Sequence, residues 1–308
     1  LAAAKAQVKA MRATVTARVR EQFGRALATA QRLQLADDAL VIAREGKNAA
    51  EERFRSGAAA LLEVNTARVE LGRAARERAE AERSQIQALA ELRFLVGLDP
   101  SEDIAAKGEL KQSRETEAVS AAELIKEALA TRADLRVNQA ALGQARAEQR
   151  LASREWIPSP KIGVSYSREE ESRASIIQGV LSLDLPIFNR NVGPRGVAAA
   201  RVRQLEVGLE TTKRQIKQQV LTAIARLRSA QAATDGYAED VVKAMQENMD
   251  LVTDSDRAGK IDFLQLVVIR RQAIEAKREY IDVLEELNAA QAELDLVLGR
   301  TSVRSAAP

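Results

Sequence analysis

Apolar positions recur at helical spacing along most of the chain. In the C-terminal third they are separated by alternating steps of four and three, the spacing of a coiled-coil seam. This seam consists of Tyr280, Leu284, Leu287, Gln291, Leu294 and Leu298. A second apolar line on a neighbouring face consists of Val267, Ile274 and Ile281. A helix with two apolar lines has neighbours on two sides, so the pattern predicts a bundle or a tube.

Proline and glycine positions divide this helical pattern into long arms. Proline is barred from helix interiors, and residues 1–99 and 195–307 contain none. Near the middle of each stretch a glycine, Gly57 or Gly259, fits the left-handed residue that follows a helix end. Each stretch is therefore predicted to form an antiparallel helical hairpin. An arm of about 50 residues would be roughly 75 Å long, which is too long for an ordinary globule.

An internal repeat relates the two stretches. A shift of 202 residues superimposes identical residues at Arg55/Arg257, Gly57/Gly259, Leu62/Leu264, Arg68/Arg270, Arg76/Arg278, Glu77/Glu279, Glu91/Glu293, Leu92/Leu294 and Gly97/Gly299. Chance agreement between two helices rich in Ala, Glu and Arg supplies several such matches. It does not readily supply two glycines with the same separation in both halves, so we favour a duplication.

Between the two stretches the apolar period changes to two. After Pro160, the residues Ile162, Val164 and Tyr166 alternate with polar or small residues. After a charged turn, a second run places Ile177, Gly179, Leu181, Leu183, Leu185 and Ile187 on one face. Two such runs predict a β-hairpin. Its strands suit an outer-membrane barrel, but a strand pair on a soluble core alternates identically, and either interpretation needs partner strands.

Composition excludes most catalytic classes. The 308 residues include 47 Lys plus Arg, 44 Asp plus Glu, and neither His nor Cys. Disulfides, zinc–thiolate sites, histidine bases and the Ser-His-Asp triad are therefore absent. The net charge of +3 gives little support to nucleic-acid binding, which needs clustered cations on one face. Low aromatic content with abundant Ala suits long helices packed closely side by side.

Membrane and targeting signals are few in this sequence. No run approaches 18 apolar residues, so no transmembrane helix is expected. No basic-then-apolar leader follows Leu1, and we expect any signal peptide to lie outside these residues.

Four segments resemble the outer-membrane efflux channel (TolC-type) family. Trp156-Ile-Pro-Ser-Pro-Lys-Ile-Gly163 opens the alternating hairpin, and Leu183-Asp-Leu-Pro-Ile-Phe-Asn-Arg-Asn-Val-Gly193 leads into a long helix. The second wording most resembles the branch that serves metal-cation and related resistance–nodulation–division (RND) pumps. Ala128-Leu-Ala-Thr-Arg-Ala-Asp-Leu135 resembles an Arg-Pro-Asp-Leu segment of the family, with Ala133 in place of the proline. Arg257-Ala-Gly-Lys-Ile-Asp-Phe-Leu264 resembles its helix-reversal motif.

The resemblance implies a mainly α fold whose long antiparallel helical hairpins form a coiled-coil tunnel. A short transmembrane β-hairpin would contribute to a trimeric β-barrel, to which each protomer gives four strands. The expected parts are residues 1–98, a first helical hairpin; 99–120, a linker; 121–157, a helix leading to the barrel; 158–190, the β-hairpin; 195–299, a second helical hairpin; and 300–308, a tail. The first repeat would then lack its own β-hairpin, so we expect these 308 residues alone not to conduct ions.

The implied function is passive. The chain would be the outer-membrane channel of a tripartite efflux pump, an exit duct for metal cations or small toxic compounds, and not an enzyme. No cofactor, metal site or nucleic acid is expected. The implied partners are two further copies of the chain, a periplasmic adaptor, an inner-membrane RND-type pump and outer-membrane lipid of a Gram-negative bacterium. The alternative is a soluble periplasmic coiled-coil adaptor or tether with a small β-domain.

The resemblance also implies two sets of site residues. The adaptor-docking periplasmic tips would comprise Arg55, Gly57, Leu62, Glu63, Arg257, Gly259, Asp262 and Leu264. The barrel residues facing lipid would be Ile162, Val164, Tyr166, Leu181, Leu183 and Leu185. Among the tip acids, Asp262 also fits a helix N-cap, with Gln265 completing a capping box, so capping and pore lining both stay open.

Overall fold

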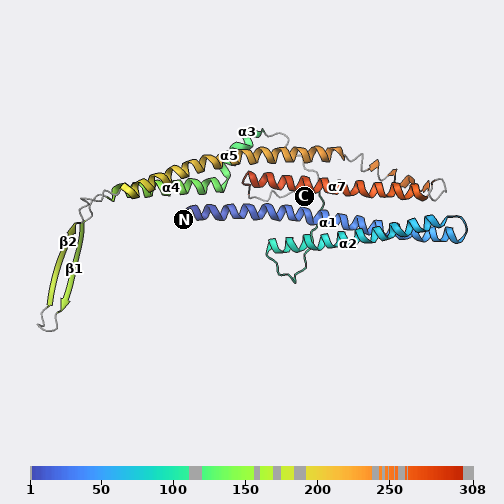
Figure 1. The fold of residues 1–308 in the computed structure, drawn as a ribbon, viewed down its shortest axis with the longest axis horizontal. Helices are drawn as coiled ribbons and strands as arrows, with labels where there is room; N and C mark the ends of the chain where they lie inside the picture. Colours follow the sequence, from blue (N-terminus) through green and yellow to red (C-terminus); the bar gives the residue numbers. More distant parts are fainter. Residues whose placement is uncertain are drawn as a thin grey trace. The chain divides into compact units, whose positions relative to one another are not determined.

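The computed structural model describes residues 2–110, 120–155, 160–168, 175–183, 192–237, 243–244, 247–248, 250–252, 254–255, 261 and 263–300. Its elements are α1 (Ala2–Arg55), α2 (Leu61–Val96), α3 (Ala121–Thr131), α4 (Ala133–Arg154), β1 (Pro160–Arg168), β2 (Ser175–Leu183), α5 (Val192–Gly236) and α7 (Phe263–Val297) (Figure 1). The prediction of a mainly helical chain with one β-hairpin is confirmed. Within the described ranges, no helix combines the length and apolar character needed to cross a membrane.

The chain divides into two compact units. One comprises Leu1–Lys9 with Arg132–Gln215, and the other comprises Ala10–Thr131 with Ile216–Pro308. In the first unit, α4 packs against the N-terminal part of α5 through buried Leu142, Ala145 and Val202. The Asn138 amide donates a hydrogen bond to the Thr212 hydroxyl at 2.9 Å beside this apolar seam.

The segment expected to be one helix leading to the barrel is instead two helices, α3 and α4. Arg132 separates them in an extended conformation, with φ −61° and ψ 128°. Its guanidinium nitrogens reach the Asp134 carboxylate at 3.0 and 2.5 Å, and that carboxylate also accepts the Leu135 backbone N–H. Ala133, the first residue of α4, occupies the position of the family's proline, and proline favours the first turn of a helix. A local ion pair therefore marks the break in this chain.

The two strands form an antiparallel hairpin with a defined register. Ile162 pairs with Leu181, Val164 with Gly179, and Tyr166 with Ile177. Directly paired residues project from the same face of a sheet. The predicted alternation is therefore confirmed over both strands: these residues share one face, whereas the other face is mixed and includes Ile176 and Val180.

In the second unit, the predicted seam of α7 is buried. Leu284, Leu287, Leu294 and Leu298 are all buried, whereas Tyr280 and Gln291 are half-buried. Alanines account for many of the buried residues of α1, which is how long helices approach closely. Gly24 of α1 shows the limit of this closeness, because a Cβ placed there would meet the Asn288 Oδ1 atom of α7 at 2.1 Å.

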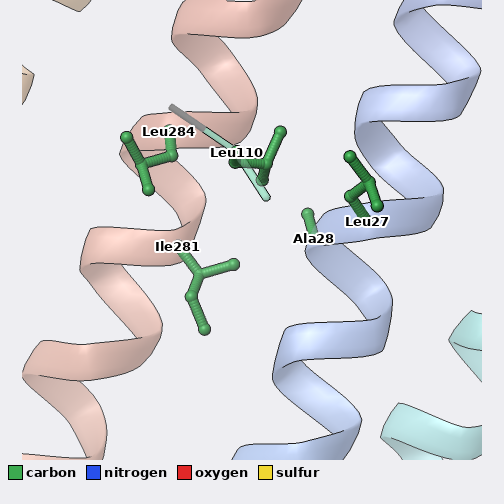
Figure 2. Packing of buried hydrophobic residues seen from close by; sticks show 5 residues of the cluster. All are labelled: Leu27, Ala28, Leu110, Ile281 and Leu284. Carbon is green, nitrogen blue, oxygen red and sulfur yellow. The ribbon is translucent and has the colours of Figure 1, made fainter. Parts of the chain in front are cut away.

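A connecting segment also contributes to this core. Figure 2 shows Leu110, from the stretch after α2, between Ile281 and Leu284 of α7 and Leu27 and Ala28 of α1. All five residues are buried. Within the segment expected to be a linker, Leu110 therefore packs between two long helices.

The duplication is visible in the structure. Under the shift of 202 residues, Leu61–Val96 falls on 263–298, almost the bounds of α7. Gly97 and Gly299 follow the two helices with φ 77° and 70°. Both helix ends have the same two backbone hydrogen bonds. The Gly97 N–H donates to the Phe94 carbonyl and the Leu98 N–H to the Arg93 carbonyl. The Gly299 N–H donates to the Leu296 carbonyl and the Arg300 N–H to the Asp295 carbonyl. The two repeats end their descending helices in the same way.

Candidate functional site: the helix-reversal tip

The turn between α1 and α2, which we call the tip (residues 53–63), is a glycine-terminated helix end. Gly57 has φ 76°, so the predicted left-handed conformation is confirmed. Its N–H donates to the Phe54 carbonyl at 3.0 Å, and the Ala58 N–H donates to the Arg53 carbonyl at 2.8 Å. These two bonds form a Schellman motif, which satisfies carbonyls left without partners at the helix end. Glycine adopts this conformation without a Cβ penalty.

Apolar packing fastens the tip to the start of α7. Ala50 of α1, Val64 and Ala67 of α2 and Phe263 of α7 form one buried cluster, with Val267 against it. Three helices are thus held together directly below the turn. The turn itself lies outside this cluster, and the packed residues of the cluster support it.

Ion pairs cross the same hairpin. Glu51 of α1 accepts from Lys47 at 2.8 Å and from Arg68 of α2 at 3.0 Å. The hydrogen bond from Lys47, and then that from Arg68, lower the pKa of the Glu51 carboxyl below its ordinary value. Glu63, a predicted site residue in the first turn of α2, lies 3.8 Å from the Arg53 guanidinium of α1, too far for a hydrogen bond.

The apex of the tip is apolar and cationic. Leu62 is 64% exposed, and Arg55 is exposed at the end of α1. Leu62 therefore lies beside the reversal without packing into its own hairpin. Phe54 and Leu61 are also exposed and were missed by sequence reasoning, although their positions on either side of the glycine were the available signal. Large apolar side chains gathered at an exposed turn are typical of a protein contact surface.

The equivalent reversal of the second repeat is only partly described. Arg257, Gly259 and Asp262 lie outside the described residues, as does the side chain of Leu264. The proposed cap by Asp262 and the second tip remain predictions. Phe263, next to them, is buried in the cluster below the first tip.

The β-hairpin is the second predicted site surface. Ile162, Val164, Tyr166, Leu181 and Leu183 are all exposed, whereas Leu185 lies outside the described residues. The Tyr166 and Ser175 hydroxyls lie 3.1 Å apart across the strands. Among the described residues this apolar face stays exposed, and an isolated two-stranded hairpin is at best marginally stable in water, so it needs a further surface.

Ion pairs join the long helices of the second unit to one another. Arg226 of α5 bridges Glu286 and Glu293 of α7 at 2.8 and 2.6 Å, and these carboxylates raise the pKa of its guanidinium. Burial lowers the pKa of Arg32, but its hydrogen bonds to Glu285 and Asp282 outweigh burial, so the net shift is upward. Within the described ranges, no three His, Cys, Asp or Glu side chains converge on a metal position. These ion pairs keep the arginine side chains charged and connect neighbouring helices.

Comparison with known proteins places this geometry in context. Residues 1–98 and 124–300 match the family described as outer membrane efflux protein. The chain is 27% identical over 301 residues to the cobalt-zinc-cadmium resistance protein CzcC of Cupriavidus metallidurans, covering 96% of this chain and 70% of that protein. It is 28% identical over 213 residues to protein CyaE of Bordetella pertussis, covering 66% of this chain and 45% of that protein.

Solved structures share the fold. The open Neisseria gonorrhoeae MtrE outer membrane channel has a TM-score of 0.80 at 23% identity, with 96% of this chain and 68% of that chain covered. CusC has a TM-score of 0.80 at 18% identity, with 96% and 70% covered. At these identities the likeness establishes the fold: helical hairpins of the kind that build channel tunnels.

Proposed function

The chain belongs to the outer membrane efflux protein family, and we propose that it forms the passive exit duct of a tripartite pump for metal cations. The assignment to efflux rests on the match of residues 1–98 and 124–300 to this family. The metal cargo is proposed from the likeness to CzcC, whose name states cobalt, zinc and cadmium resistance. A duct of this kind needs neither cofactor nor reaction centre, because the inner-membrane partner would supply the energy.

We propose a homotrimer in the outer membrane of a Gram-negative bacterium. The exposed apolar face of β1 and β2 supports this, because three chains with neighbouring strands would pair the strand edges and turn this face toward lipid. Ile162, Val164, Tyr166, Leu181, Leu183 and Leu185 would be the lipid-facing residues. The long helices would continue into the periplasm as the tunnel.

The tip is proposed as the contact for a periplasmic adaptor that connects the duct to an RND-type pump. Exposed Leu62 and Arg55 offer an apolar anchor with a neighbouring charge, and the buried cluster around Phe263 holds them in place. The soluble adaptor or tether alternative is not favoured. In this chain the helical hairpins flank the strands, as they do in the channel family.

Transport in cells tests the proposal. The full-length protein would replace the channel of a Gram-negative strain that keeps its adaptor and RND pump for divalent metals. We expect restored tolerance to cobalt and zinc together with lower cell-associated metal. Restored tolerance to organic compounds alone would refute the metal cargo and leave the efflux role standing. Failure to restore any efflux, despite outer-membrane insertion of the trimer, would refute the duct.

A further inference from the structure

A cavity of about 530 Å³ lies between α1, α2 and α7, below the tip. Its floor is apolar, with Ile42 and Ala43 of α1, Ala74 of α2, and Phe263, Val267 and Ile274 of α7. Small side chains create the space, because Ala43 and Gly46 of α1 face it where larger residues would fill it.

Both ends of the cavity are closed by contacts between the helices. Toward the tip lies the buried cluster of Ala50, Val64 and Phe263. At the other end, the Arg278 guanidinium of α7 reaches Glu77 of α2 at 2.9 Å. The cavity is therefore bounded at both ends along the helix axes. It forms where the three helices lie farther apart than they do at these two contacts.

The rim of the cavity is lined by charged side chains. Its lining includes five cationic residues, Lys47, Arg73, Arg76, Arg270 and Arg271, and two acidic residues, Glu70 and Glu77. Most of these charges are already paired: Glu70 with Arg73 at 3.1 Å and Glu77 with Arg278 at 2.9 Å. Lys47 pairs with Glu51 at 2.8 Å and Arg76 with Glu80 at 3.7 Å. Arg271 is exposed, and no described side chain pairs with it. An apolar floor with the exposed guanidinium of Arg271 at its edge complements a molecule with an apolar body and an anionic head.

We infer that this cavity is a binding site for a small anionic amphiphile. Its volume falls within the range of roughly 300–1,000 Å³ typical of small-molecule sites. The apolar body would lie against Ile42, Phe263 and Ile274, and the anionic group would reach Arg271. Because all three helices line the cavity, an occupant would bind them together and oppose changes in their spacing. Such a ligand would act on the wall of the duct and not as its cargo.

The test uses the full-length protein in phosphatidylcholine nanodiscs with two fluorescent probes. Anilinonaphthalene sulfonate is an anionic amphiphile, and N-phenylnaphthylamine has the same aromatic skeleton without the sulfonate. We expect saturable binding of the sulfonate at one site per chain and no matching site for the neutral probe. Ala43→Trp should abolish the site by filling it. Arg271→Glu should weaken it roughly threefold to tenfold, as expected for reversal of one partly exposed charge.

Arg83→Glu is the matched control, because Arg83 is an exposed arginine of α2 outside the cavity. It should leave sulfonate binding unchanged, and circular dichroism should show the same helix content in all three variants. Equal binding of both probes, or sulfonate binding that survives Ala43→Trp, would overturn the inference. Absence of probe binding, together with adaptor affinity that falls in Ala43→Trp and Arg271→Glu, would overturn it in favour of a protein-docking groove.

Discussion

Helices α2 and α7 are equivalent segments of the two repeats, yet they are packed differently. Three equivalent positions are buried in both helices: Val64/Leu266, Ala88/Ala290 and Leu92/Leu294. At other positions burial differs in both directions: Ala67 and Ala74 are buried only in α2, and two larger differences favour the second repeat. Leu61 is 54% exposed whereas its equivalent, Phe263, is 6% exposed. Val96 is 45% exposed whereas its equivalent, Leu298, is 0% exposed.

This difference shows what the duplication retained and what each copy acquired. The shared positions form one seam that both copies use against a neighbouring helix. The additional buried positions of α7 match its two apolar lines, because α7 contacts α1 on one side and α5 on another. At two positions of these lines α2 carries a small or polar residue, Gly72 and Gln85, where α7 has half-buried Ile274 and buried Leu287. The two equivalent helices therefore differ in how many sides are packed: α7 packs on two sides.

The largest expected effect concerns one pair of equivalent positions that differ in burial, Leu287 of α7 and Gln85 of α2. Leu287 is 1% exposed, so Leu287→Ala should lower the free energy of unfolding by about 3 kcal/mol. The equivalent Gln85→Ala removes only the acceptor of the Thr29 hydroxyl and should cost about 1 kcal/mol. Guanidinium unfolding, followed by helical circular dichroism, measures both. Equal costs would show that the two helices are packed alike.

A smaller effect should be the same in both repeats. Gly97→Ala and Gly299→Ala each place a Cβ at a left-handed residue, and each should cost about 1 kcal/mol. The equality follows from their shared hydrogen bonds at the helix end. Thermal unfolding of the two variants makes the comparison. A cost confined to one of them would mean that the C-terminal ends of the two helices are not equivalent.

The smallest expected effect concerns pH and the first hairpin. Because Lys47 and Arg68 lower the pKa of Glu51 in the folded chain, its pairing stabilises the hairpin above the unfolded-state pKa. This contribution is lost as pH falls through the lowered pKa of the folded state. The thermal unfolding temperature of the wild type should therefore be slightly higher than that of Glu51→Gln at neutral pH. The difference between the two temperatures should vanish in acid. A difference that grows in acid would contradict the assigned direction of the pKa shift.

The sequence allowed the long helices, the strand faces and the left-handed Gly57 to be predicted, since each depends on periodicity or on one backbone-specific residue. The break at Arg132 was missed because no proline or glycine marks it; the structure shows an ion pair between Arg132 and Asp134 at this point. The burial of Leu110 was missed because a residue in an irregular segment has no period to reveal it. At the tip, Phe54 and Leu61 were missed because α1 and α2 themselves leave these side chains unpacked, which only the structure shows.

The most direct test of the account is the affinity of the adaptor for a changed tip. Arg55→Glu combined with Leu62→Asp removes the exposed anchor and reverses its neighbouring charge, while Gly57 and the buried cluster stay intact. Arg257→Glu with Leu264→Asp makes the same change in the second repeat, and Arg83→Glu again serves as the control. We predict that the first two variants keep the helix content and trimer mass of the full-length channel but bind the adaptor at least about tenfold more weakly. Unchanged affinity in both would contradict docking at the helix reversals.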